Sequence, residues 1–190
     1  MKRIKTIIQE SSRSNLRLLL LSTITAGAML LAGTDDPHAG HGNTAAPAKL
    51  VQDVRTATSQ YANVSAATAA GYQPLFGCVS GPDQGAMGVH YINLTLYGAG
   101  KLDVTQPQAL IYEPSNGGLV LVGAEYIVDA ATWLRQNNAP PMLEGQAFLL
   151  VTSPNRYGLP SFFELHVWAW RDSPNGAFVD WNTRVSCERQ

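Results

Sequence analysis

Two histidines lie in stretches that are otherwise apolar and strand-like. His90 stands in the run GAMGVHYIN (residues 85–93), and His166 stands in FFELHVWAW (residues 162–170). A polar side chain on a buried strand needs a partner, because a buried polar group without a hydrogen bond is costly. A neutral imidazole can bind a divalent metal ion, and it can also carry a proton near neutral pH. His90 and His166 are therefore the first candidates for a functional site.

Three carboxylates share this kind of surroundings. Glu113, Glu125 and Glu164 fall on predicted strands, and the alternation of side chains along a strand places each of them among apolar neighbours. Two imidazoles with one or more carboxylates can hold a divalent metal ion and leave coordination positions open. We predict the metal ligands to be His90, His166, Glu113, Glu125 and Glu164.

The same residue types allow three other interpretations. A carboxylate beside an imidazole tunes it for general acid–base catalysis, so the cluster could belong to an enzyme such as a lyase, an isomerase or a metal-dependent oxygenase. The groups could instead be internal hydrogen bonds that hold the sheet in register. A metal-free protein could grip an apolar molecule through the ligand-binding residues Tyr91, Tyr112, Trp168 and Trp170. The residues alone leave these alternatives open.

The familiar short catalytic motifs are missing. The chain has no Gly-x-Ser-x-Gly elbow, no phosphate-binding loop and no dinucleotide fingerprint. Hydrolases of that type, nucleotide hydrolases and nicotinamide-dependent enzymes therefore receive no support from the sequence.

The N-terminus has the plan of a secretory signal peptide. Five basic residues precede an apolar run at residues 18–31, and small residues at 26–28 and 31–33 offer cleavage sites. An uncleaved membrane anchor is the alternative, but the run is shorter than the about 20 residues that a spanning helix needs. We predict a signal peptide at residues 1–33, a flexible linker at residues 34–48 and one secreted domain at residues 49–190. The expected location is extracytoplasmic, in the medium or the cell envelope.

The net charge of the chain after the leader limits the kinds of partner that the domain is expected to bind. The first 32 residues hold five basic residues and one acidic residue, which leaves 8 Lys+Arg against 13 Asp+Glu in the rest, a net charge of −5. A mildly acidic domain argues against nucleic acid and anionic membranes as partners. A small molecule or a metal ion is the expected partner, with no stable membrane anchor after processing.

The two cysteines agree with export. Cys78 and Cys187 are the only cysteines, and both follow the leader. An even number of cysteines in a secreted chain indicates a disulfide. We predict the Cys78–Cys187 bridge; two free thiols are the alternative.

The elements that carry the candidate residues predict an α+β domain. Apolar residues recur every three or four positions over residues 49–70, which predicts one long N-terminal helix ending at Gly71. Strands and turns follow it, apart from a short helix at residues 130–137. The predicted strands cover residues 89–97, 109–113, 119–128, 146–152, 162–170 and 177–185. We expect the helix to pack on a curved, mainly antiparallel sheet of five or six strands that curls toward a barrel.

The order of the local motifs resembles a group of small exported bacterial proteins of uncharacterised function. The resemblance covers residues 49–187. It is carried by AAGY (69–72), GAMGVHYIN (85–93), LIYEP (110–114), LVGAEY (121–126), ELHVW (164–168) and WN (181–182). It implies a single exported domain, and it lends no activity, cofactor or catalytic residue.

Overall fold

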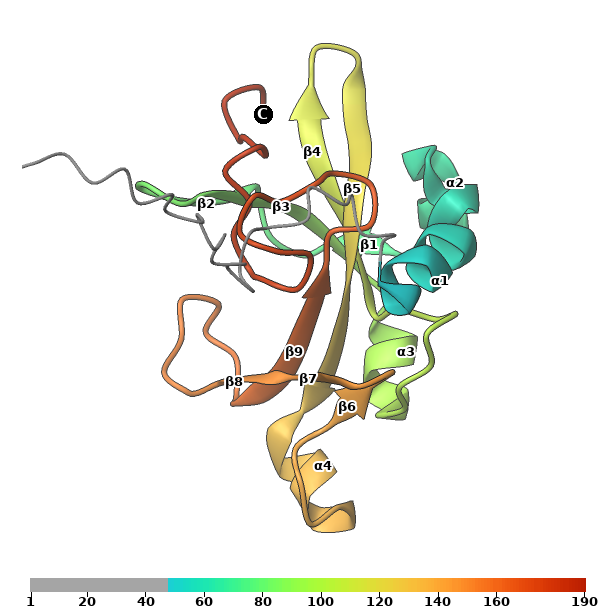
Figure 1. Ribbon diagram of the computed structural model, residues 1–190, viewed down its shortest axis with the longest axis vertical. Helices are drawn as coiled ribbons and strands as arrows, with labels where there is room; N and C mark the ends of the chain where they lie inside the picture. The colour runs from blue at the N-terminus through green and yellow to red at the C-terminus, as the bar shows by residue number, and fades with distance from the viewer. Residues whose placement is uncertain (1–47) are drawn as a thin grey trace, which may run out of the picture. The chain divides into compact units, whose positions relative to one another are not determined.

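The computed structural model describes residues 48–190. The predicted signal peptide and all but the last residue of the predicted linker lie outside the described residues. The described part is an α+β fold built on a mostly antiparallel sheet (Figure 1).

The main sheet has seven strands, and all its pairings are antiparallel. Its strands are β1 (Gln73–Pro74), β2 (Val79–Gly81), β3 (Gly85–Ile92), β4 (Ala109–Ser115), β5 (Gly118–Asp129), β8 (Leu149–Val151) and β9 (Phe162–Val167). They follow the order β1-β3-β4-β5-β9-β8, and β2 also pairs with β3. The short strands β6 (Met142–Leu143) and β7 (Gln146–Ala147) pair only with each other. Because β1 and β8, the two end strands of this order, do not pair with each other, the sheet is open and the predicted approach to a barrel is wrong.

The single long helix predicted for residues 49–70 is also wrong. The segment forms α1 (Lys49–Thr58), one turn of 3-10 helix (Ser59–Tyr61) and α2 (Val64–Ala69). Asn63 separates the 3-10 turn from α2, because its backbone is extended and its side chain accepts a hydrogen bond from the Ser65 N–H. Asparagine is among the best residues for starting a helix in this way.

Two further elements differ from the expected pattern. β3 ends just before Asn93, and α3 (Leu94–Ala99) follows, whereas the sequence predicted a strand that continued to residue 97. The Asn93 side chain begins this helix by accepting hydrogen bonds from the Thr95 and Leu96 N–H groups. The expected extended segment at residues 177–185 meets β3 through one isolated bridge, between Ala86 and Asn182. The short helix near residue 130 is confirmed as α4 (Ala130–Gln136).

The sheet has two differently covered faces. The helix face carries Leu110, Tyr126 and Leu165, which form one core cluster with the buried residues of α1 and α2. The opposite face, here called the site face, holds two smaller apolar clusters: one around Ile111 and Trp168, the other around Ile92, Ala109, Ile127 and Phe162. Figure 1 shows α1 and α2 on one side of the long strands and the C-terminal segment on the other.

The C-terminal segment is fastened to the site face. Cys78 and Cys187 form the predicted disulfide, with their Cα atoms 5.6 Å apart. Glu113 on β4 forms an ion pair with Arg171 and accepts a hydrogen bond from the Ser186 N–H at 3.0 Å. The chain after β9 is thus held at both ends, and the residues between, including Asp180, are placed over the sheet.

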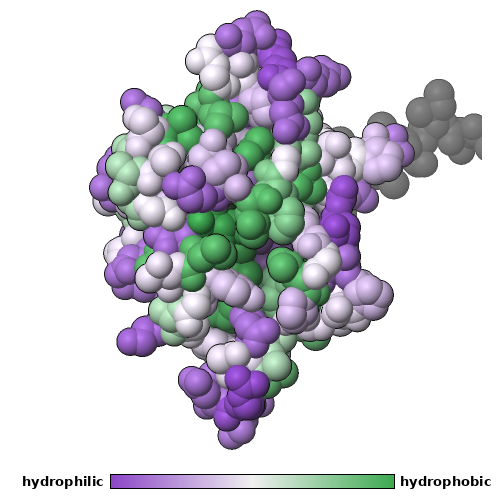
Figure 2. All heavy atoms as spheres, turned by 180° about the vertical axis from the view of Figure 1, so that it is seen from behind, coloured by the Kyte–Doolittle hydropathy of each residue, from purple (hydrophilic) through white to green (hydrophobic). Residues whose placement is uncertain are grey.

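Part of the surface is apolar. Figure 2 shows apolar side chains gathered in the middle of one face, with polar side chains above and below them. Large apolar residues of the described part that remain exposed include Leu75 and Leu94. None of the described helices has the length and apolar character needed to cross a membrane.

Candidate metal centre and its pocket

The candidate site lies on the site face, between the two apolar clusters. Its side chains come from β3 (His90), β5 (Glu125) and β9 (Glu164 and His166). Glu125 and His166 are directly opposite each other in the β5–β9 register. Cross-strand neighbours of this kind have side chains close enough to interact. The alternation of side chains along β9 sends Glu164 and His166 to the same face, as the sequence predicted.

His90 reaches this group across an intervening strand. In the register, His90 pairs with Ile111, and Ile111 pairs with Gly123. The neighbouring row places Ala109 opposite Glu125. Ala109 carries only a methyl group, so the site face of β4 beside Glu125 stays free of a large side chain. A side chain at Gly123 on β5 would meet the Val167 carbonyl and the Trp168 ring, so this position must also be small. The sequence therefore builds the site from small residues as well as polar ones.

The three side chains meet at short range. The Nε2 atoms of His90 and His166 are 3.4 Å apart, and His90 Nε2 is also 3.4 Å from Glu125 Oε2. His166 Nδ1 is 3.9 Å from Glu125 Oε1. One ligand atom from each of His90, Glu125 and His166 lies within 4.8 Å of the others. All three residues are at most 5% exposed.

Asp180 approaches His166 from the C-terminal segment. Its Oδ1 lies 3.6 Å from His166 Nδ1, and neither atom has a hydrogen-bond partner. Buried polar atoms without partners are rare in folded proteins and require an explanation. A histidine that binds a metal through one nitrogen usually donates its other N–H to a carboxylate. Asp180 stands where such a carboxylate would stand for His166.

Burial keeps both imidazoles uncharged. It lowers the pKa of His90 to about 4, and the nearby Gly88 backbone opposes only part of this shift. Burial, with a smaller contribution from His90, lowers the pKa of His166 well below its ordinary value. Both side chains are therefore neutral at pH 7, and neutral imidazole is the form that coordinates metals.

Burial has the opposite effect on the carboxyl groups. It raises the pKa of Glu125 well above its ordinary value, and the neighbouring Glu164 raises it further. Burial, with a contribution from Asp180, raises the pKa of Glu164 to about 7, although its contact with Glu125 opposes this. The cluster thus retains a proton on this pair near neutral pH, because two close carboxylates resist double ionisation.

The spacing of the three side chains suits a small metal ion. In a tetrahedral zinc site each ligand lies about 2.0–2.1 Å from the ion, which puts two ligand atoms about 3.4 Å apart. The His90–His166 and His90–Glu125 distances are both 3.4 Å. Two imidazoles and one carboxylate form a ligand set that binds divalent transition metals and leaves a position open. His90, Glu125 and His166 could therefore bind a metal ion.

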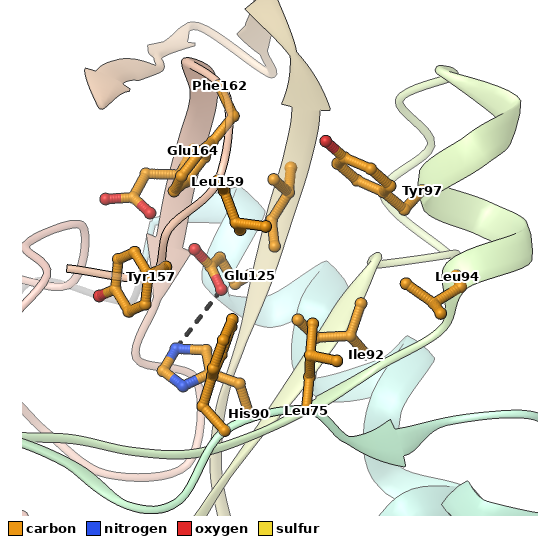
Figure 3. A pocket seen from close by; sticks show the side chains of 12 residues that line it. Leu75, His90, Ile92, Leu94, Tyr97, Glu125, Tyr157, Leu159, Phe162 and Glu164 are labelled. Atoms are coloured by element: carbon orange, nitrogen blue, oxygen red, sulfur yellow. Dashed lines mark ion pairs between the residues drawn. The ribbon is translucent and has the colours of Figure 1, made fainter. Parts of the chain in front are cut away.

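A pocket of about 90 Å³ opens in front of this group. Nine of its twelve lining residues are apolar or aromatic, and the other three are His90, Glu125 and Glu164. Figure 3 shows these three polar side chains together, with Leu94 and Tyr97 on the other side of the pocket. His166 does not line the pocket. An ion held by the three residues would therefore have His166 behind it and the pocket in front.

The other predicted site residues lie elsewhere. Glu113 is on the site face, but it binds Arg171 and Ser186 instead of joining the cluster. Tyr112 is on the helix face, where its hydroxyl donates to the Tyr61 carbonyl at 2.7 Å and its ring packs against Tyr91.

The two predicted tryptophans are also engaged in the fold. Trp168 is buried, its Nε1–H donates to the Val179 carbonyl, and its ring stacks near His166 with the ring centres 6.1 Å apart. Trp170 is 41% exposed and donates to Thr58 Oγ1. Neither tryptophan, nor Tyr91 or Tyr112, lines the pocket.

Sequence reasoning missed two parts of the site. Asp180 lies in the segment 177–185, which the sequence predicted to be a strand, but nothing local marked its carboxylate as a partner of His166. The pocket aromatics Phe76, Tyr97 and Tyr157 lie on loops or on α3 and meet only in the folded chain. Their one sequence signal was their aromatic character, which many core residues share.

No protein-family model, curated protein or solved structure matches this chain.

Proposed function

We propose that this protein binds a divalent transition-metal ion through His90, Glu125 and His166. The observation that carries the proposal is the pair of 3.4 Å separations from His90 Nε2 to the His166 and Glu125 ligand atoms. Buried neutral imidazoles support it, because such groups coordinate a metal without first losing a proton. Asp180 supports it as the carboxylate that would orient His166.

We infer that the ion serves a ligand or substrate and not the fold alone. Structural zinc sites are usually closed by four protein ligands, whereas catalytic sites have three and an open position. The group of His90, Glu125 and His166 offers three ligand atoms, and two of these residues, His90 and Glu125, line the pocket. The second candidate function is accordingly a metal-dependent enzyme that acts on a small molecule in this pocket.

We place the protein outside the cytoplasm. The Cys78–Cys187 disulfide supports this location, because such bonds persist mainly in oxidising compartments. The signal-peptide pattern at residues 1–33 and the resemblance to exported bacterial proteins point the same way.

Metal analysis of the exported protein tests the proposal. The protein is dialysed against zinc, then against buffer, and its metal content is measured by elemental analysis. We expect about one ion per chain, and a large loss of metal in His90→Ala, His166→Ala and Glu125→Gln. The matched control is His38→Ala with His41→Ala, which removes the two histidines outside the described residues and should leave the bound ion in place.

The outcomes separate the candidate functions. Wild-type protein without metal, after loading with zinc, copper, manganese or iron, would overturn the proposal and leave a structural polar cluster or a metal-free binder. Metal that is lost with His38 and His41 but not with His90 would also overturn it. Turnover of a substrate by the loaded protein, absent in Glu125→Gln, would establish the enzyme.

A further inference from the structure

We propose that the pocket binds a small apolar amine, with its ammonium head at Glu125 and Glu164 and its hydrocarbon body along the apolar wall. This inference goes beyond metal binding and concerns the metal-free protein, in which Glu125 is not coordinated; it uses the charge and shape of the pocket alone.

The charged groups of the pocket select the sign of the head group. Two carboxyl groups line the pocket, and no lysine or arginine does. Within residues 48–190, the ion pairs formed by lysine and arginine use other acids: Lys49 pairs with Asp53 and Glu144, and Arg171 pairs with Glu113. Two buried carboxyl groups this close share a proton and carry at most one negative charge, and a bound cation would favour their ionised form. A carboxylate or phosphate ligand would instead add negative charge beside them.

The two carboxyl groups of the pocket are deeply buried. Glu125 and Glu164 are each 3% exposed, so a ligand in the pocket must satisfy their hydrogen-bonding groups directly. A primary ammonium offers three N–H donors. It can therefore serve both carboxyl groups at once, which a single hydroxyl cannot do.

The walls select an apolar body. Ile92, Leu159 and Phe162 line the pocket together with the rings of Tyr97 and Tyr157. Aromatic faces attract a cation that lies against them. The pocket is smaller than the cavity of about 150 Å³ that encloses a benzene molecule in another protein.

The mouth of the pocket leaves room for the rest of such a molecule. Two lining residues, Leu75 and Leu94, are 46% and 61% exposed, so apolar surface continues from the pocket to the outside. In Figure 3 Leu94 and Tyr97 lie across from the two carboxyl groups, so an amine could span from the floor to this apolar rim.

Three probes that carry the same phenyl ring test which head group the pocket prefers. Benzylamine, benzyl alcohol and benzoate are titrated by calorimetry into full exported protein that has been stripped of metal. We expect benzylamine to bind at least about tenfold more tightly than benzyl alcohol, and benzoate to show no binding, because the probes share the ring and their head groups are positive, neutral and negative. The absence of metal from this experiment keeps its outcome separate from that of the metal proposal.

Variants then test whether benzylamine binds in the pocket. Glu164→Gln should weaken benzylamine binding at least about tenfold and change benzyl alcohol binding by less than about twofold. Glu144→Gln, which alters a carboxylate of the Lys49 pairs, should change neither. A thermal melt of each variant confirms that it is folded.

Several results would overturn the amine proposal. They are equal binding of the amine and the alcohol, a preference for benzoate, no binding of any probe, and undiminished amine binding in folded Glu164→Gln. Because the comparison of probes uses wild-type protein, a variant that fails to fold does not remove the test.

Discussion

The Nε2 atoms of His90 and His166 lie 3.4 Å apart, although two strands of the sheet, β4 and β5, stand between the strands that carry them. This contact joins residues 76 positions apart in the chain. It places two buried nitrogens at a separation that one metal ion can span.

The two histidines should be energetically coupled. In a double-mutant cycle of His90→Ala and His166→Ala on metal-free protein, the effects on the free energy of unfolding should differ from additivity by about 0.5–3 kcal/mol, because the side chains are in contact. Urea denaturation measures each free energy. Additive effects would mean that the rings do not meet in solution.

Zinc binding should release a proton from the carboxyl pair. Burial raises the pKa of Glu125 and the neighbouring Glu164 raises it further, so the carboxyl pair holds a proton that must leave before Glu125 can bind a metal as a carboxylate. The imidazoles are already neutral because burial lowers their pKa values. We expect the release of about one proton per ion near pH 6, and zinc affinity that rises with pH in this region. Calorimetry in buffers with different ionisation enthalpies measures the release.

The Glu125→Gln variant is the control for this proton. Its amide cannot titrate, so weak residual zinc binding should release fewer protons than wild type. Unchanged release would assign the proton to another group and contradict the expected state of Glu125.

Glu164 should make its own contribution to the pH dependence of stability. Burial raises its pKa from 4.5 to about 7, so folded protein holds a proton that unfolded protein loses between these values. Stability from this group is present below about pH 4.5 and is lost as the pH rises to about 7. Glu164→Gln should therefore gain stability relative to wild type over this range, by a few kcal/mol at most. Unfolding in the presence of a chelator measures the difference.

The opposite sign is expected for His90. Its pKa is lowered from 6.5 to about 4, so this group makes folded protein more stable as the pH rises between those values. Wild type and Glu164→Gln share this contribution, and subtracting one curve from the other removes it. A difference that falls with rising pH would contradict the buried state of Glu164.

The small side chain of Ala109, beside the cluster, should be required for metal binding. Ala109 is fully buried and lies opposite Glu125 on β4. Ala109→Leu should fill the space above β4, cost about 1–3 kcal/mol of stability and sharply weaken zinc binding. Ala124→Leu, at a fully buried position on the helix face, is the matched control, with a similar stability cost and little effect on zinc. Equal effects on zinc would show that only stability had changed.

The disulfide should stabilise both the fold and the site. Cys78 and Cys187 are 109 residues apart, and closing a loop of that length is worth about 4–5 kcal/mol in the chain-entropy description. Replacing both cysteines with serine should lower the melting temperature and weaken zinc binding, because Asp180 belongs to the segment that the bridge fastens. Wild type treated with a reductant should behave like the variant, and free thiols in oxidised wild type would contradict the bridge.

Those features of the site that depend on a single strand were predicted correctly. Alternation along β9 correctly placed Glu164 and His166 on one face. The helix prediction failed at Asn63, because periodicity of apolar residues continues through the break and only the local hydrogen bond to Ser65 reveals it.

The sequence by itself determined which polar side chains would point into apolar surroundings and which cysteines were available to pair. These features are local, because a strand alternates its side chains every two residues whatever its partners are. The tertiary structure decided which carboxylates reach the histidines. Glu113 shares the face of Glu125, but it lies four residues along β4 from Ala109, which pairs with Glu125, a distance of about 13 Å. Asp180 arrives from a loop that the disulfide and the Glu113 contacts hold in place. Strand order and register are set by the packing of the whole chain, and so only the folded protein brings His90, Glu125, His166 and Asp180 together.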